Sequence, residues 1–501
     1  METIAFENYR CIKNSGPIAI KPITILLGAN SSGKSSVLKF FPLLKQSSET
    51  KTRGSFLWYG PFVDFQDFSN VVMEGENKMT ISFDIAKATS NFITVIFHHT
   101  TRTIFKNVHV DLIIEKLSKE PYEFLSEVRI SLAKCKILIK YKDTEKIQSI
   151  SVNSTKLEEN NIICVKRGDF IPLCIEQHST DGHLSMENIG AQVLPYTLSK
   201  AVKSLEAEDF QKKYGDIDAE VREHLESYTS LCNAMKKCLN STEHIEEICD
   251  AYIIENINVY ISTINQYLEA LAQRIHYVQP LRAISQRYYR ISNVAVDEID
   301  SDGKNLPMFY ASLEKENRDK FNQWLGEVLH DVQLKLQTKS GFVELLLKEK
   351  GKSAHNMVDV GFGYTQILPI LILIWKVVYL PKRRMIPALE MATETIIAIE
   401  QPELHLHPRM QGLFADMLCT IIKKCREDKI DLRFIIETHS ENIVSRLGEN
   451  IELNNLDTKD VNVVLFDAQK EGFSTEIHPT EFDNRGILKN WPYNFFTHNV
   501  Y

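Results

Sequence analysis

The sequence predicts an α/β fold in which a parallel sheet is accompanied by an antiparallel β lobe and an inserted helical subdomain. From residue 364 onward, apolar strands alternate with helices, a pattern typical of a parallel sheet with helical crossovers. Residues 56–180 are rich in β-branched and aromatic residues with short polar breaks, which indicates several antiparallel strands. Between residues 196 and 275, apolar positions recur every three or four residues with almost no glycine or proline, so long amphipathic helices are expected.

The composition limits the classes of protein to which the chain can belong. It has 501 residues, 44% apolar and 25% charged, which predicts a soluble globular chain of several domains and excludes collagen-like and wholly disordered classes. The net charge of -8 disfavours a protein that coats nucleic acid generally. Nine cysteines, an odd number without a CxxC pair, indicate reduced thiols rather than a disulfide framework or zinc fingers.

Two segments bear on the location of the protein in the cell. The N-terminal segment METIAFENYRCIKNS has charged residues where a signal peptide needs an apolar core. The longest apolar run, residues 367–380, is interrupted by Lys376 and is shorter than the roughly 20 residues of a membrane span. It is predicted to be a buried helix, and the protein is expected to be cytoplasmic with no membrane partner.

A phosphate-binding motif lies in the loop between an early apolar strand and a helix-forming segment. Gly28-Ala-Asn-Ser-Ser-Gly33-Lys34-Ser35 matches GxxxxGK[ST] in the context that this motif requires, which disfavours a chance glycine-serine turn. Glycines let the backbone wrap phosphates, and free amides at the helix N-terminus face the anion. Lys34 is expected to reach the β- and γ-phosphates and Ser35 to offer its hydroxyl to Mg²⁺, so ATP and Mg²⁺ are the predicted cofactors.

Two later apolar strands end in polar residues. Residues 395–399 are followed by Glu400, at the place where a nucleoside triphosphatase needs a carboxylate to hold the water shell of Mg²⁺. A second apolar strand includes residues 434–436. The Glu-Thr-His-Ser segment that follows it contains His439. We expect His439 to contact a γ-phosphate or the attacking water.

The same region permits a metallohydrolase interpretation. His405, His407 and His439, together with Glu400 and Glu403, resemble a metal-ligand cluster, because the HLH segment puts alternate residues on one face of an extended chain. No H-x-x-x-H spacing supports this alternative, and it is disfavoured.

With these residues assembled, the chain resembles the ABC/SMC-like ATPases, especially the overcoming-lysogenization-defect-like group. Its phosphate loop is almost N-terminal, its carboxylate strand follows hundreds of residues later, and IEQPELHLHP is close to the group's I-E-x-P-E-x-H-L-H-P signature. Segments 277–289 and 358–371 and the C-terminal end resemble a bacterial subgroup with a conserved C-terminal extension. The resemblance implies an ABC-type P-loop ATPase head. Its expected domains are 1–55 and 277–501 as the two parts of one nucleotide-binding domain, 56–190 as a β-rich lobe and 191–276 as a helical insertion.

The resemblance also implies roles for single residues. Gly361, Gly363 and Thr365 look like a variant of the ABC signature loop, which opens a helix toward the nucleotide of the opposite subunit; a simple helix cap is the alternative. His439 is the switch histidine, and Gln66 is a candidate for the glutamine that links Mg²⁺ to the lobe. The implied phosphate and nucleotide contacts are Gly28, Asn30, Ser32, Gly33, Lys34, Ser35 and Ser36, and the implied Mg²⁺-side groups are Ser35, Gln66 and Glu400.

One position departs from the family pattern. ABC ATPases usually place a catalytic glutamate directly after the Mg²⁺-side carboxylate, and here that position is Gln401, whose amide cannot accept a proton as a carboxylate does. Either Glu403 acts as the base because the turn at Pro402 returns it to the site, or hydrolysis is slow and the ATP-bound closed state is the working form. We favour Glu403.

These features lead to two expected functions. One phosphate loop and one signature loop per chain imply at least a homodimer. Relatives often carry a C-terminal Toprim nuclease, but residues 440–501 are too few for one. The favoured function is an ATPase sensor and scaffold of bacterial anti-phage defence that controls a separately encoded effector nuclease, as in Septu (PtuA-like) or PARIS systems. The alternative is a DNA-maintenance or repair ATPase that binds DNA directly; the acidic charge and the absence of long heptad repeats disfavour it.

Overall fold

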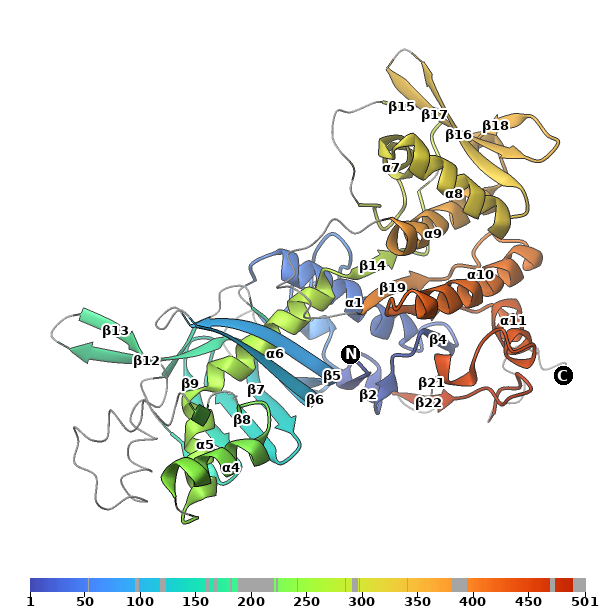
Figure 1. The fold of residues 1–501 in the computed structure, drawn as a ribbon. Helices are drawn as coiled ribbons and strands as arrows, with labels where there is room; N and C mark the ends of the chain where they lie inside the picture. The colour runs from blue at the N-terminus through green and yellow to red at the C-terminus, as the bar shows by residue number, and fades with distance from the viewer. Residues whose placement is uncertain are drawn as a thin grey trace. The chain divides into compact units, whose positions relative to one another are not determined.

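The computed structural model describes most of the chain, and its described residues fall into two compact units (Figure 1). The first unit takes its described residues from 1–18 and 43–273, and the second from 19–42, 274–385 and 394–501. The domain boundaries expected from the sequence stay a prediction, and residues 191–219 of the expected helical insertion lie outside the described part. The described residues are 1–52, 54–94, 99–117, 123–158, 162–165, 169–180, 183–187, 220–221, 224–240, 242–283, 285–290, 296, 298–339, 341–380, 394–468 and 474–489.

A large antiparallel sheet forms the first unit's framework. Its strands are β1 (Thr3–Tyr9), β2 (Ile12–Asn14), β5 (Lys78–Thr94), β6 (His99–Lys116), β7 (Glu123–Leu132), β8 (Cys135–Tyr141), β9 (Ile147–Val152) and β10 (Thr155–Leu157). They pair in the order β10-β9-β8-β7-β6-β5-β1-β2. The two-residue β3 (Ile18–Ala19) falls at the division between the units. In β8 every second residue, from Cys135 to Tyr141, is buried, which is the alternation of a strand with one face on a core.

Helices and a small sheet complete the first unit. The sheet consists of β11 (Ile162–Val165), β12 (Leu173–Thr180) and β13 (His183–Glu187), and the helices are α4 (Tyr228–Leu239), α5 (Ile245–Glu255) and α6 (Ile257–Ala272). Tyr260 of α6 stacks on Phe105 of β6 with ring centroids 4.8 Å apart. Asn265 of α6 accepts from the backbone N–H of Ile171 at 2.9 Å and donates to its carbonyl at 2.7 Å. The predicted α/β class with an antiparallel β lobe and helices is confirmed.

A mostly parallel sheet forms the centre of the second unit. Its strands are β4 (Ile23–Gly28), β14 (Ile275–Val278), β19 (Thr395–Glu400), β20 (Leu432–Glu437), β21 (Val461–Ala468) and β22 (Thr475–Thr480). They pair in the order β14-β19-β20-β4-β21-β22, and only the β21–β22 pair is antiparallel. Every residue of β4 and β19 is buried, as expected for parallel strands covered on both faces. The N-terminal β4 therefore belongs to the same sheet as the last third of the chain.

Three long helices belong to this unit: α9 (Phe362–Tyr379), α10 (Pro408–Glu427) and α11 (Glu441–Glu452). The helix α1 (Lys34–Glu49) begins in this unit, to which its residues up to Pro42 belong. Among the described helices, α9 alone is long and apolar enough to cross a membrane, and most of it is buried inside the unit. The predicted buried helix at residues 367–380 is thus confirmed for α9. Trp375 of α9 is among the largest fully buried side chains.

A second, smaller sheet stands at one end of this unit, drawn in yellow and orange in Figure 1. It pairs β15 (Tyr289–Arg290), β17 (Phe342–Glu349) and β16 (Val332–Lys339) in that order, with β18 (Ala354–Asn356) on β17. Two helices, α7 (Leu306–Ser312) and α8 (Lys315–Val328), lie beside it. The ring of Phe321 in α8 meets Trp375 edge-on at 5.3 Å and Tyr310 at 5.8 Å, which joins these elements to α9.

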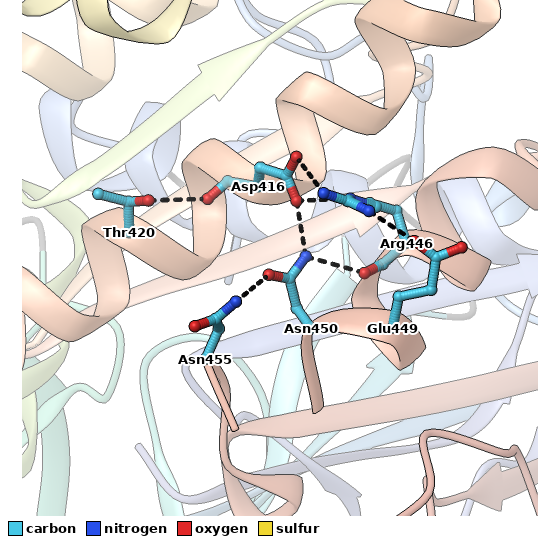
Figure 2. Close-up of polar contacts among 6 residues, drawn as sticks. All are labelled: Asp416, Thr420, Arg446, Glu449, Asn450 and Asn455. Carbon is cyan, nitrogen blue, oxygen red and sulfur yellow. Dashed lines mark hydrogen bonds and ion pairs between the residues drawn. The ribbon is translucent and has the colours of Figure 1, made fainter. Parts of the chain in front are cut away.

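A polar network fastens α10 to α11 (Figure 2). The guanidinium of Arg446 donates to both carboxylate oxygens of Asp416, at 2.7 and 3.0 Å. The buried Asn450 side chain donates to Asp416 Oδ1 at 2.7 Å and to the Arg446 carbonyl at 2.9 Å. Bidentate pairs of this kind fix geometry as well as contributing energy. Because α10 follows β19 and α11 follows β20, the network holds the helices that emerge from the two carboxylate strands.

We expect Asp416→Ala to destabilise the α10–α11 pair by about 1–3 kcal/mol, because it removes both Arg446 bonds and leaves one N–H of Asn450 without an acceptor. Hydrogen–deuterium exchange of the α10 and α11 amides measures this change. The control is Lys459→Ala, which removes an exposed ion pair with Asp457 and should change stability by less than about 0.5 kcal/mol. Equal exchange rates in the two variants would contradict a role for the network.

Candidate functional site

The loop between β4 and α1 has the backbone of a phosphate cradle. Ser31 and Gly33 have left-handed φ values of 62° and 93°, and α1 begins directly after them. A Cβ atom at Gly28 would lie 2.5 Å from the carbonyl oxygen of Phe466, so this position accepts glycine alone. The Lys34 ammonium donates to the carbonyls of Gly28 and Ala29 at 3.0 and 2.6 Å. The Lys34 side chain is therefore held against its own loop.

Two buried carboxylates lie side by side at the ends of neighbouring strands. Glu400 of β19 is the register partner of Glu437 of β20. Burial raises the pKa of both carboxyl groups above the ordinary value, and Lys39 opposes this shift in each case. Glu400 accepts a hydrogen bond from the Tyr277 hydroxyl at 2.6 Å, and its other oxygen lies 3.7 Å from the Lys39 ammonium.

Glu437 contacts the phosphate loop directly. The Ser35 hydroxyl donates to Glu437 Oε1 at 2.8 Å, whereas Oε2 is buried without a hydrogen-bond partner among the described residues. No role for Glu437 is predicted from the sequence, although this residue stands two positions before the predicted switch histidine at the end of an apolar strand. The sequence does not show the order of the strands in the sheet. In the structure β20 lies between β19 and β4, which puts Glu437 next to the phosphate loop.

The segment after β19 turns back to the segment after β20. The backbone N–H of Gln401 donates to the Glu437 carbonyl at 2.8 Å. The two carboxylate oxygens of Glu403 accept from the Thr438 hydroxyl and the His439 backbone N–H, each at 2.7 Å. Burial, and then the positive charge of Lys34, lower the pKa of the His439 imidazole and favour its neutral form. Glu403, His439 and Lys34 are thus brought together in one place.

The loop after β14 adds a cation to this edge of the sheet. Arg282 is 4% exposed, and its Nη2 donates to the Glu400 carbonyl at 3.0 Å. Its Nε and Nη1 have no hydrogen-bond partner among the described residues. Burial lowers the pKa of Arg282 to about 10, against the opposing charges of Glu403 and Glu400. In the sequence, segment 277–289 stands out only by its resemblance to the bacterial subgroup, and no role is predicted for Tyr277 or Arg282.

The expected signature loop begins α9. Gly361 is the residue before the helix, and a Cβ atom there would meet open space. A Cβ atom at Gly363 would lie 3.3 Å from the His405 carbonyl oxygen, so this helix start packs against the segment that follows Glu400. The Thr365 hydroxyl donates to the Phe362 carbonyl at 2.7 Å, as in a helix first turn. These contacts fit both a signature loop and the alternative of a helix cap.

The remaining candidates have varied surroundings. Asn30 is exposed, Ser36 is buried, and the buried Ser32 hydroxyl has no hydrogen-bond partner among the described residues. Gln66 belongs to the first unit, where its side chain accepts from Asn70, and its link to Mg²⁺ stays a prediction. 

The two histidines of the HLH segment have local roles. His407 caps α10 by accepting from the Arg409 N–H, and the His405 ring meets Phe362 edge-on. Within the described ranges, no group of three or more His, Cys, Asp or Glu is placed to hold a metal ion. The disfavoured alternative, a metal-ligand cluster of these histidines with Glu400 and Glu403, is therefore not assembled by the residues that the structure describes.

The residues present fit a nucleotide with Mg²⁺. The cradle accepts phosphates, Lys34 can exchange backbone carbonyls for phosphate oxygens, and Ser35 offers a hydroxyl beside the unpartnered Glu437 Oε2. Oxygen ligands of this kind are those that Mg²⁺ prefers.

Comparison with known proteins decides the family. The family model described as "AAA ATPase domain" matches residues 1–444. The chain belongs to this AAA ATPase family. No curated protein matches its sequence.

Among solved structures, three head domains resemble this ATPase. An Smc head bound to the C-winged helix domain of ScpA is 10% identical, covers 96% of this chain and 97% of its own, and has a TM-score of 0.35. An Smc head with an extended coiled coil, derived from Pyrococcus furiosus, is 9% identical, with 96% of each chain covered and a TM-score of 0.34. The SMC head domain of Thermotoga maritima is 8% identical, with 95% and 98% covered and a TM-score of 0.31.

We expect Gly28→Ala to weaken ATP binding by roughly tenfold or more, since a clash costing about 1–3 kcal/mol must move the loop or β21. Titration with a fluorescent ATP analogue measures the affinity. The matched control is Gly412→Ala in α10, where the nearest atom to a new Cβ is 4.0 Å away and where alanine favours the helix. Normal affinity in the Gly28 variant would contradict the cradle.

Proposed function

We propose that the protein binds and hydrolyses ATP with Mg²⁺ and uses ATP to join two copies of itself. The observation that carries this proposal is the meeting, at one edge of the parallel sheet, of the phosphate loop, the Glu400–Glu437 pair and the segment containing His439. Ligands of open α/β sheets bind outside the carboxyl ends of the strands, and all these groups lie there.

The residues of the site have distinct tasks in this proposal. Lys34 leaves the carbonyls of Gly28 and Ala29 to bind phosphate oxygens, and the loop amides take the remaining charge. When bound, Mg²⁺ neutralises phosphate charge and fixes the phosphate geometry. Tyr277 and Lys39 hold Glu400 in place, and the neutral His439 contacts the γ-phosphate or the attacking water.

Glu403 is the proposed general base in place of Gln401. The turn at Pro402 brings its carboxylate to the His439 backbone and within the electrostatic reach of Lys34. A carboxylate there can still accept a proton from water, because each of its oxygens has a second lone pair. The competing explanation is that ATP is held rather than turned over.

Single-turnover hydrolysis separates these two explanations. We expect Glu403→Gln to slow the step by roughly 10²–10⁴-fold, the usual contribution of a general base, and Gln401→Glu to accelerate it. Glu441→Gln, an exposed glutamate at the start of α11, is the matched control and should leave the rate unchanged. If Glu403→Gln hydrolyses ATP at the normal rate, the base assignment is wrong.

ATP-dependent dimerisation follows from one phosphate loop and one signature loop per chain. Phe362, the first residue of α9, is 51% exposed, and Leu281 and Tyr288 in the same unit are exposed as well. The exposed Phe362 ring at the start of the predicted signature helix supports a surface that becomes covered in the working state.

We expect the Glu403→Gln protein to sediment as a monomer without nucleotide and as a dimer or larger oligomer with ATP and Mg²⁺. Adding Phe362→Glu should prevent association while ATP binding stays normal, because the charge would be desolvated at the interface. A Glu403→Gln protein that remains monomeric under both conditions would refute the dimer.

The biological role that we propose is that of a cytoplasmic sensor and scaffold in anti-phage defence, controlling a separately encoded effector nuclease. The net charge of -8 supports a protein partner as the output of the ATP switch. A nuclease gene beside that of the ATPase, and loss of phage resistance in a Lys34→Ala strain, would support it. Strongly salt-dependent binding of duplex DNA by the purified protein would favour the DNA-maintenance alternative.

A further inference from the structure

We propose that Glu437 is a second acidic residue of the Mg²⁺ site and that it supplies the carboxylate nearest to the metal. This inference rests on the proposed ATP-binding function. Its first support is the 2.8 Å hydrogen bond from the Ser35 hydroxyl, the group expected to face the metal, to Glu437 Oε1. Among the described residues, Glu400 has no such bond to the phosphate loop; its carboxylate is held by Tyr277 and faces Lys39.

The second support is the unsatisfied oxygen of Glu437. The residue is 3% exposed, and its Oε2 has no hydrogen-bond partner in the described part of the chain. Buried carboxylate oxygens are normally paired, because leaving one unpaired after removal from water is costly. A cation beside Ser35 and Oε2 would satisfy it.

Burial raises the pKa of Glu437, and Lys34 and Lys39 both oppose this shift through their charge. The hydrogen bonds and ion pairs of these two lysines among the described residues nevertheless go to other groups. The Lys34 ammonium donates to two loop carbonyls, and the Lys39 ammonium lies 3.7 Å from Glu400. Glu437 is therefore the acid of the pair with an oxygen left open, whereas both oxygens of Glu400 face partners. A phosphate-bound Mg²⁺ is a ligand of the right charge and oxygen preference for this place.

The geometry of the strands explains why the carboxylates of Glu400 and Glu437 can serve one metal site. Adjacent strands lie about 4.8 Å apart, and the register pairs Glu400 with Glu437 at the last residue of each strand. The two carboxylates are thus placed so that both could serve one Mg²⁺ ion if it were bound. Glu437, which contacts Ser35, would hold the ion, and Glu400, which Tyr277 holds in place, would support it.

The test is the Mg²⁺ dependence of ATP binding, with Glu437→Gln, Glu400→Gln and the matched control Glu441→Gln. A fluorescent ATP analogue reports affinity in EDTA and over a Mg²⁺ titration, and electron paramagnetic resonance reports bound Mn²⁺. We expect Glu437→Gln to bind the metal-free nucleotide as well as the wild type, because the glutamine oxygen can still accept from Ser35. We expect its metal requirement to rise by roughly 10–100-fold, at least as much as in Glu400→Gln, while Glu441→Gln is unchanged.

Three results would overturn the inference. A wild-type Mg²⁺ and Mn²⁺ response in Glu437→Gln, with the response lost in Glu400→Gln, would leave the ATP switch intact and remove Glu437 from the metal site. A normal metal response with lost single-turnover hydrolysis would make Glu437 a base instead. Absence of ATP binding by the wild-type protein would overturn the proposed function itself.

Discussion

The register of three parallel strands is the constraint on which the site depends. The pairing of β19, β20 and β4 sets Glu400 opposite Glu437, and Glu437 opposite Leu26, two residues before the phosphate loop. The ladder continues beyond the strands, because the Gln401 N–H donates to the Glu437 carbonyl and the Thr438 N–H donates to that of Leu26. A slip of one residue would turn each carboxylate to the other face of the sheet. Backbone pairing, rather than side-chain contact alone, therefore places Glu437 beside Ser35 and Glu400 beside Glu437.

The pair of buried acids makes the site electrostatically costly unless positive charge lies nearby. Burial raises the pKa of Glu400 and of Glu437, so the environment favours neutral carboxyl groups unless positive charge is near. Lys34 and Lys39 supply part of this positive charge, and burial in turn lowers the pKa of Lys34. Perturbed groups gathered at the carboxyl edge of an α/β sheet are typical of a functional site. A site of this charge pattern gains stability when a cation arrives with its phosphate.

The sequence was sufficient for features encoded in short segments. The alternation of strands and helices predicted the parallel sheet, and the motif from Gly28 to Ser35 predicted the loop between β4 and α1. Features that depend on the order of the strands in the sheet could not be predicted from the sequence. Nothing local to Glu437 says that β20 lies next to β4, and Tyr277 precedes its partner Glu400 by more than a hundred residues. A role for Arg282 could not be predicted from the sequence either. Its Nε and Nη1 atoms, which have no hydrogen-bond partner among the described residues, indicate a role only because the structure shows that they are buried.

Several polar groups of the candidate site are held by contacts within the chain. Lys34 is bonded to its own loop, Ser35 to Glu437, and Glu403 to the Thr438–His439 segment. Lys34, Ser35 and Glu403 each have a partner within the chain, whereas Glu437 Oε2 has none among the described residues, so a bound nucleotide would exchange some hydrogen bonds for others and gain only their difference. The Glu403 contacts join the segment after β19 to the segment after β20. These two segments lead into α10 and α11, which the Asp416–Arg446 network fastens together. In the proposed function, a nucleotide that displaced some of these contacts would alter the balance between two arrangements of the site, which is the physical requirement for an ATP switch.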